Sequence, residues 1–182
     1  MVDEAHAFGV LGQHGGGLVE ELGLGAQVDI QMGTLSKAAG SFGGYACGTK
    51  ILRDYLINKS RSFIYTTALP PSLAQASRAA LKIIKEASQL RRKLQDNADH
   101  LRAQLKLLGF DTMNSSTPII PILVKDPVQA IAMSKHLLQQ GILLQAIRPP
   151  TVPVATSRLR LTVTAAHTKE DLNTLLNALR NL

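Results

Sequence analysis

The chain has no tryptophan, one cysteine and few other aromatic residues, with three tyrosines and four phenylalanines among 182 residues. Aliphatic side chains must therefore supply most of any core. The single cysteine, Cys47, excludes an internal disulfide and fits a reducing compartment. No apolar run approaches the roughly 20 residues that span a bilayer, and Asp3 and Glu4 stand where a signal peptide would be basic. We therefore expect a cytoplasmic protein that makes no membrane contact.

Acidic residues are also scarce, with 13 Asp and Glu against 20 Lys and Arg and a net charge of +7. The excess lies mainly in residues 51–110, where eleven basic residues stand against four acidic ones. At helical spacing such residues usually form a solvated helix face. No zinc-finger or RNA-recognition pattern accompanies them. The charge therefore favours attraction of an anionic substrate, and a DNA-binding module is the weakest alternative function.

Glycine turns and short apolar segments organise the first 70 residues. The spacing of the apolar residues and the residue types together predict strands and one helix in this region. Strands are expected at residues 28–32 and 63–67, and residues 43–48 are expected to form a turn into another short strand. The helix is expected at residues 50–59.

A long helical pattern follows, from Leu69 to Leu108, with Gly109 as its stop. It is too long for one typical globular helix, so we expect a break near Ser88. Beyond residue 110 short strands alternate with helices, which is typical of α/β architecture. The strands are predicted at residues 118–124, 141–147 and 158–164, and the helices at residues 127–140 and from a Thr168 cap to Arg180.

Two short motifs carry candidate chemistry. Asp3 ends a strand and is followed by His6, and Lys37 follows the apolar stretch 28–32 among small and hydroxyl residues. An enzyme that uses pyridoxal 5'-phosphate (PLP) needs a carboxylate for the pyridine nitrogen and a lysine for the Schiff base. It also needs donors such as Thr34 for the phosphate, and burial would make the lysine a competent nucleophile. The combination predicts a PLP site, and no metal site is expected.

Six segments carry a family resemblance in addition. They are VDEAHAFGVLG at residues 2–12, GTLSK at 33–37, GGY at 43–45, FIYTTALPP at 63–71, IRPPTVP at 147–153 and RLRLTVTAAHT at 158–168. In this order they resemble the alpha-oxoamine synthase family of fold-type-I PLP enzymes, and the last two segments most resemble its biotin-pathway branch. The resemblance implies an α/β chain with the PLP-dependent transferase fold of type I.

The resemblance also implies a role for individual residues. Lys37 would form the Schiff base and move the substrate's alpha proton, and Arg158 has no assigned role. Asp3 would bind the pyridine nitrogen, His6 the phenolic oxygen, Thr34 the phosphate of its own subunit, Thr66 the phosphate of the neighbouring subunit of a homodimer, and Arg160 the carboxylate of the substrate.

The implied reaction is decarboxylative condensation of L-alanine with a pimeloyl thioester, carried by coenzyme A or by acyl carrier protein. The alternatives are glycine C-acetyltransferase or another activity of the same family. An alternative of another class is a non-catalytic fragment that pairs with or regulates a partner.

Family members are roughly twice as long as this chain, in keeping with two domains. We therefore expect residues 1–70 to be the C-terminal part of the PLP-binding large domain, residues 71–108 an interdomain helical region and residues 109–182 a small C-terminal α/β domain. We also expect the preceding half of the family's sequence to be missing and the isolated chain to be inactive. Residues from about 110 onward are expected to fold alone.

Overall fold

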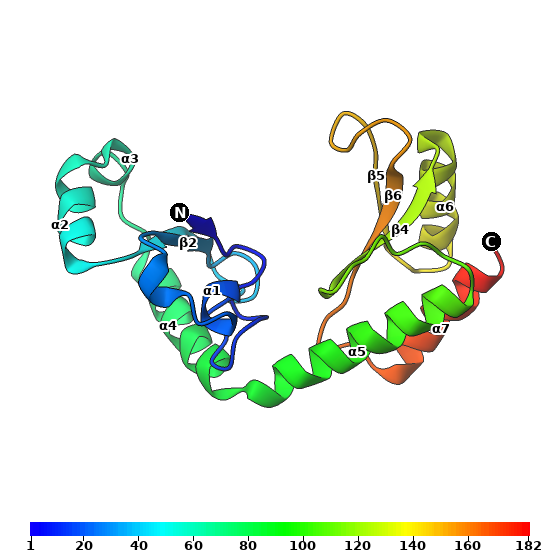
Figure 1. The fold of residues 1–182 in the computed structure, drawn as a ribbon, viewed down its shortest axis with the longest axis horizontal. Coiled ribbons are helices and arrows are strands. Elements are labelled where there is room, and N and C mark those ends of the chain that lie inside the picture. The colour runs from blue at the N-terminus through cyan, green and yellow to red at the C-terminus, as the bar shows by residue number, and fades with distance from the viewer. The chain divides into compact units, whose positions relative to one another are not determined.

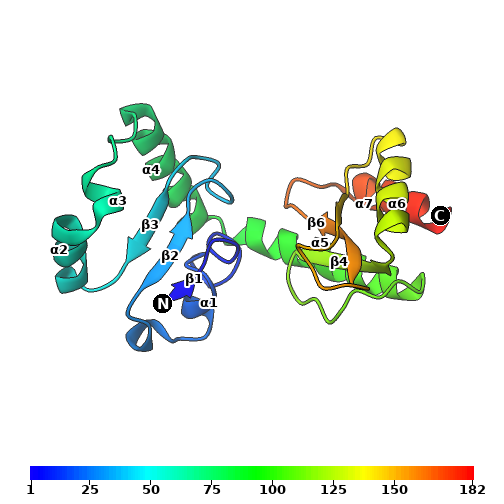
Figure 2. The ribbon, with the colours of Figure 1, turned by 90° about the horizontal axis from the view of Figure 1, so that it is seen from above.

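The computed structural model describes residues 1–182 and divides them into two compact units, Met1–Arg91 and Arg92–Leu182. Each unit contains one three-stranded sheet with helices (Figures 1 and 2). The chain is therefore α/β, as predicted. The boundary between the units lies inside the predicted helical region 71–108, and the assignment of three parts to the chain stays a prediction. None of the helices combines the length and the apolar composition that a membrane-spanning helix requires.

The sheet of the N-terminal unit combines one parallel and one antiparallel pair. Strands β1 (Val2–Asp3) and β2 (Gln31–Thr34) run parallel, with Asp3 opposite Met32. Strand β3 (Gly44–Cys47) pairs with β2 in the antiparallel sense. Strand β2 begins three residues later than the sequence predicted, whereas the predicted turn into β3 is confirmed. Because β1 and β2 are parallel, their carboxyl ends meet at one edge of the sheet.

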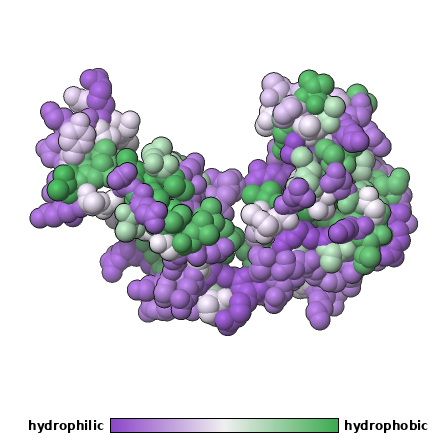
Figure 3. Space-filling view, in the orientation of Figure 1, coloured by the Kyte–Doolittle hydropathy of each residue, from purple (hydrophilic) through white to green (hydrophobic).

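An arm projects from this sheet (Figure 1). It consists of α2 (Lys50–Lys59), where the sequence predicted it, and α3 (Arg61–Ile64). The predicted strand at residues 63–67 is wrong, because no strand lies beside it and its amides find local partners: Tyr65 N donates to the Arg61 carbonyl. No residue of either helix is buried. Large apolar side chains are therefore exposed on this arm: Ile51, Tyr55, Ile57, Phe63, Ile64 and Tyr65. Hydrophobic surface is visible on the N-terminal unit in Figure 3.

The predicted break in the long helical region is confirmed. Helix α4 (Pro71–Glu86) and helix α5 (Ser88–Leu107) are separated by Ala87, which has a non-helical backbone. The Arg91 guanidinium donates to the carbonyls of Ile84 and Gln13. It thereby caps the end of α4 and fixes it to the glycine-rich loop that follows β1. That loop leads into the short helix α1 (Leu18–Glu21) and a turn of 3₁₀ helix at Gly25–Gln27.

The sheet of the C-terminal unit is wholly antiparallel, with strand order β4-β6-β5. Strands β4 (Ile119–Lys125) and β6 (Ser157–Thr162) confirm two predicted strands, and of the predicted strand 141–147 only β5 (Gln145–Ile147) forms. The predicted helices are also confirmed. They are α6 (Pro127–Gln139), capped by Asp126, and α7 (Lys169–Arg180), which begins with a Thr168–Asp171 capping box.

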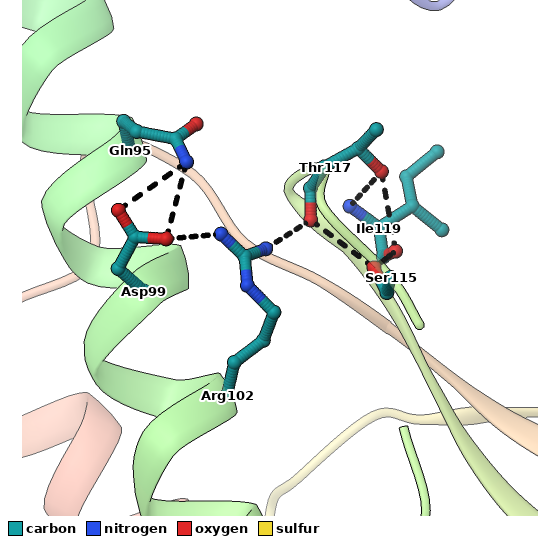
Figure 4. A network of polar contacts seen from close by, with 6 residues as sticks. All are labelled: Gln95, Asp99, Arg102, Ser115, Thr117 and Ile119. Carbon is teal, nitrogen blue, oxygen red and sulfur yellow. Dashed lines mark hydrogen bonds and ion pairs between the residues drawn. The ribbon is translucent and has the colours of Figure 1, made fainter. Parts of the chain in front are cut away.

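A connected network fixes the loop that leads into β4 (Figure 4). Arg102 of α5 donates to the Asp99 carboxylate and, at 2.6 Å, to the Thr117 carbonyl. Ser115 donates to the Ile119 carbonyl at 2.8 Å. These bonds satisfy the Thr117 carbonyl of the loop and the Ile119 carbonyl at the start of β4, so they fix the loop to the strand that it enters.

The two units differ in how well they are packed. In the C-terminal unit fifteen buried apolar residues form one cluster drawn from α5, α6, α7 and the sheet. In the N-terminal unit only Phe8, Val19 and Ala39 are buried apolar residues. Because buried apolar area is the main source of folding free energy, the C-terminal unit is much the better stabilised of the two.

Candidate active site at a sheet edge

Four of the six predicted site residues come together where β1 and β2 end. Asp3 is the last residue of β1, and His6 follows it in a turn. Thr34 is the last residue of β2, and Lys37 follows it in the segment that leads to β3. The amide of the residue after Asp3 donates to the Met32 carbonyl at 2.7 Å, which extends the parallel pairing to the edge. Carboxyl ends of parallel strands are a common place for ligand sites.

The register gives this edge two distinct faces. Asp3 pairs with Met32, and Thr34 lies two residues further along β2, so alternation places the side chains of Asp3 and Thr34 on one face. Gly33 and its partner Tyr45 lie on the other face. The acidic and hydroxyl groups therefore share a face that the aromatic packing leaves open.

Two hydroxyls stand side by side at the end of β2. Thr34 Oγ1 lies 2.6 Å from Ser36 Oγ, and it accepts from the Ser36 amide at 3.1 Å and contacts the Gly43 carbonyl at 3.2 Å. Their positions are fixed by the backbone rather than by long side chains. Each hydroxyl has one proton, so when Thr34 donates to Ser36, the Ser36 hydroxyl can donate to an anionic oxygen such as that of a phosphate.

Lys37 is exposed in this chain, so the burial expected for a reactive lysine is absent. The physical reason is its location in the segment beyond the end of β2, where the neighbours of its side chain are few. Its carbonyl accepts from Gly40 N at 3.0 Å, which turns the chain back toward β3. The flanking Ala39 is buried, so the backbone of Lys37 is anchored while its amine faces outward.

A buried carboxylate beneath the edge was not assigned a role from the sequence. Glu4 is 2% exposed, and its two oxygens accept from the amides of Leu18 at 2.9 Å and Val19 at 2.7 Å. It thus caps α1 and connects the residue after Asp3 to the returning chain. A Cβ at Gly17, where φ is 111°, would stand 2.5 Å from a Glu4 oxygen, so a side chain there would displace the carboxylate. The sequence signal that could have identified Glu4 is its position next to Asp3 in the motif.

A second carboxylate organises the glycine-rich loop. Glu20 accepts from Gly16 N at 2.6 Å and from His14 Nδ1 at 2.7 Å. Partial burial raises the pKa of Glu20, but the hydrogen bonds from Gly16 and His14 outweigh it and the net pKa is lowered. Glu20 thus holds both the backbone and the ring of His14 in place. No group of three or more His, Cys, Asp or Glu side chains is placed to hold a metal ion.

Tyr45 supports the edge from the other face. Its ring meets that of Phe8 edge-on, with centroids 5.5 Å apart. Burial, followed by the acidic groups of Cys47, Glu4 and Asp3, raises the pKa of Tyr45 to about 12. The phenol is therefore neutral at physiological pH and serves as packing, a function that the sequence did not indicate.

The other two predicted site residues lie elsewhere. Thr66 follows α3 on the arm, is exposed, and donates its hydroxyl proton to the Ser62 carbonyl. Arg160 lies on β6 of the C-terminal unit, half-buried, between Pro121 of β4 and Gln145 of β5. It alternates with Leu159 and Leu161, which face the core, so its guanidinium stands on the open face of the sheet. It forms none of the chain's ion pairs.

The donor set at the edge fits PLP. Asp3 offers a carboxylate, Thr34 and Ser36 offer adjacent hydroxyls, and Lys37 offers an amine, all from two neighbouring strand ends. An acid for the ring nitrogen, donors for the phosphate and an amine for the carbonyl carbon are the three protein groups that this cofactor requires.

The sequence model of the aminotransferase class I and II family matches residues 1–179. The chain belongs to this family. It is 48% identical over 182 residues to a putative 8-amino-7-oxononanoate synthase of Halalkalibacterium halodurans, covering 100% of this chain and 46% of that protein. It is 47% identical over 181 residues to the 8-amino-7-oxononanoate synthase of Trichlorobacter lovleyi, covering 98% of this chain and 46% of that protein. The chain thus spans about half the length of the curated relatives it matches.

Solved structures give the same result for the fold. A Sphingomonas wittichii serine palmitoyltransferase matches with a TM-score of 0.94 and 31% identity over 99% of this chain and 46% of that one. An 8-amino-7-oxononanoate synthase from Francisella tularensis matches with a TM-score of 0.86 and 28% identity over 99% of this chain and 53% of that one. The fold is therefore part of the type I fold of PLP-dependent transferases, and the resemblance found in the six motifs is confirmed.

Proposed function

We propose that this chain supplies the cofactor lysine and the substrate arginine of an 8-amino-7-oxononanoate synthase. The reaction joins L-alanine to a pimeloyl thioester and releases carbon dioxide and the thiol carrier. The observation that carries the proposal is the parallel pairing of β1 and β2, which brings Asp3 and His6 to the same edge as Thr34 and Lys37. The names and identity of the relatives favour this member of the family.

The cofactor, when bound, withdraws electrons from the alpha carbon of an amino acid and so stabilises a carbanion there. Asp3 would keep the pyridine nitrogen protonated through its carboxylate, and His6 would donate to the phenolic oxygen. Thr34 would hold the phosphate. Lys37 would bind the cofactor covalently, give way to the amino group of alanine, and then take the alpha proton.

Arg160 would bind the carboxylate of alanine. A guanidinium presents two parallel N–H donors to a carboxylate, and β6 is the middle strand of its sheet, which makes Arg160 a rigidly mounted anchor. The carboxylate must be held until the new carbon–carbon bond has formed and then leave as carbon dioxide. A fixed guanidinium suits the first of these steps because it orients the bond that later breaks.

A homodimer would complete the site. The arm of α2 and α3 exposes Tyr55, Phe63 and Tyr65 although it buries nothing of its own, and Thr66 lies at its end. A helix pair without buried residues gains its stability from a partner surface. Pairing of two copies through this arm would carry Thr66 to the phosphate of the neighbouring subunit.

A sister activity is the second candidate, because serine palmitoyltransferase structures match the fold with a TM-score of 0.94. Serine would then replace alanine, and a long-chain thioester would replace the pimeloyl group. The choice of amino acid separates the two candidates.

The first test uses the 182-residue chain alone. Incubation with PLP, reduction with borohydride and peptide mapping should give an adduct at Lys37 that is absent from Lys37→Ala. An adduct scattered over the exposed lysines Lys50, Lys59 and Lys82 would count against the site.

The second test supplies the part of the relatives' length that this chain does not cover. The portion of the Halalkalibacterium halodurans relative that precedes the matched region is joined to residues 1–182, and product formation is measured with alanine, serine and glycine. We expect alanine-dependent formation of 8-amino-7-oxononanoate, its loss in Lys37→Ala, and no activity in the isolated chain. Preference for serine or glycine would support a sister activity, and full activity in Lys37→Ala would refute the role of this lysine.

A further inference from the structure

Segment 35–43, which carries Lys37, is held in shape by backbone hydrogen bonds between its own residues. Leu35 N donates to the Gly43 carbonyl at 2.8 Å, and Ser41 N donates to the Leu35 carbonyl at 2.8 Å. These bonds define the shape of the segment. The Thr34–Gly44 strand pair holds the two ends of the segment. Neither bond determines how the middle of the segment lies against the rest of the unit, because both partners of each bond belong to the segment itself.

A pair of hydroxyls joins the segment to α4. Ser41 Oγ lies 2.8 Å from Ser77 Oγ, which in turn lies 2.8 Å from the Leu73 carbonyl. Ser41 Oγ is 3.4 Å from that same carbonyl. A hydroxyl has one proton to donate. If Ser77 donates to Leu73 and Ser41 to Ser77, both short bonds form, whereas the opposite order relies on the longer contact.

Burial makes this link more than a surface contact. Ser77 is 8% exposed and is the one buried residue of α4. Ser77 donates to the Leu73 carbonyl of its own helix, so what it lacks without Ser41 is a donor to its buried oxygen. Ser77 therefore favours the position of the segment in which Ser41 donates to it. Close packing holds the segment in the same region. Ala38 lies so near Gly9 that a Cβ at Gly9 would stand 2.5 Å from the Ala38 Cβ and 3.4 Å from Ile84 Cδ1 of α4.

The side chain of Lys37 takes part in none of the chain's ion pairs and is exposed. The position of its amine is therefore set through the backbone of segment 35–43. We propose that Ser77, acting through Ser41, is a positioning residue that fixes this segment on α4 and so holds Lys37 over the strand ends of Asp3 and Thr34. The inference rests on the proposed role of Lys37.

Hydrogen exchange of the 182-residue chain without cofactor tests the link directly. Ser77→Ala should speed exchange of the amides of Leu35 and Ser41 by about fivefold, the effect of one lost hydrogen bond. Helix α4 should keep its protection or gain some, since alanine is the better helix former. Ser41→Ala should have the same effect, and the double variant should add nothing further. Ser72→Ala, on the exposed start of the same helix, is the matched control.

Borohydride trapping with PLP then tests the consequence for Lys37. Ser77→Ala and Ser41→Ala should lower the yield at Lys37 relative to the parent chain and to Ser72→Ala. Unchanged exchange in segment 35–43, equal acceleration throughout α4, or faster exchange with undiminished trapping would each overturn the inference. If the parent chain gives no adduct at Lys37, the proposed function fails at that step and the positioning role falls with it, while the exchange data still decide whether the Ser41–Ser77 link exists.

Discussion

Tyr45 lies so close over Gly33 of the neighbouring strand that a Cβ at Gly33 would stand 2.5 Å from its hydroxyl oxygen and 2.7 Å from Cζ. The ring cannot simply swing aside, because its edge contact with Phe8 holds it. Gly33 is also the residue before Thr34, so the space that glycine leaves is part of what shapes the end of β2.

Gly33→Ala should therefore destabilise the N-terminal unit by about 1–3 kcal/mol, the usual effect of overpacking. All three tyrosines, Tyr45, Tyr55 and Tyr65, belong to this unit, so urea unfolding followed by tyrosine emission reports on it alone. Gly25→Ala is the control, because nothing lies within 4 Å of a Cβ there. Equal midpoints for the two variants would contradict the prediction.

Glu4→Gln should destabilise the same unit by about 2 kcal/mol, because a neutral amide replaces a buried carboxylate that accepts from two amides. One of those amides, at Leu18 or Val19, would then face an NH₂ group. Hydrogen exchange should rise most at residues 18 and 19. Glu86→Gln, at an exposed end of α4, should change neither the stability of the unit nor the exchange at residues 18 and 19. A similar loss of stability in Glu86→Gln would show that the effect is one of net charge.

The stability of the N-terminal unit should fall in alkaline solution through Tyr45. The folded state raises the pKa of this phenol from 10.0 to about 12, so it holds the proton more tightly than the unfolded chain does. The contribution of Tyr45 to the free energy of unfolding is complete below pH 10 and is lost as the pH rises through about 12. Urea midpoints measured from pH 8 to pH 12 should show this loss in the parent chain. Tyr45→Phe should flatten the dependence of the urea midpoint on pH in this alkaline range. If the midpoint of Tyr45→Phe still falls with the same slope, other groups cause the loss of stability.

Ser157→Ala should leave the C-terminal unit as stable as before or stabilise it by up to about 1 kcal/mol. Ser157 is fully buried, and its hydroxyl is the one buried side-chain polar group without a hydrogen bond. Removing an unsatisfied hydroxyl removes a desolvation cost. Guanidinium unfolding followed by circular dichroism measures the change. A clear loss of stability would contradict the prediction.

Residues 92–182 should fold alone in a cooperative transition, whereas residues 1–91 should not. The fifteen-residue core cluster lies wholly within the former, and it includes Ala98, Leu101 and Leu105 of α5. The independent part therefore starts earlier than the residue 110 expected from the sequence. Amide NMR spectra of the two fragments would test this prediction, and well-dispersed amide signals for residues 1–91 would refute it.

The sequence predicted the C-terminal unit well because its signals are local. The alternation in β6 and the Thr168 cap of α7 depend on neighbouring residues only, and both are confirmed. The strand expected at residues 63–67 failed for the opposite reason: β-branched and aromatic residues favour a strand only when another strand lies beside them. Here local hydrogen bonds of α3 took their place.

The same distinction applies to the candidate site. Asp3, Thr34 and Lys37 could be proposed from the sequence because chemistry and motif mark them, and the parallel pairing of β1 and β2 brings their strand ends to one edge. Glu4, Tyr45 and Ser77 were missed because their significance lies in contacts with residues far along the chain, such as Val19, Gly33 and Ser41. No spacing rule in a single sequence reports those contacts.

Strand β6 places Arg160 between Leu159 and Leu161, so one alternation serves both the packed face and the charged face. A shift of one residue along this strand would bury a guanidinium and expose two leucines at once. The insertion or deletion of a single residue in β6 would therefore disturb the packed face and the charged face of the sheet together.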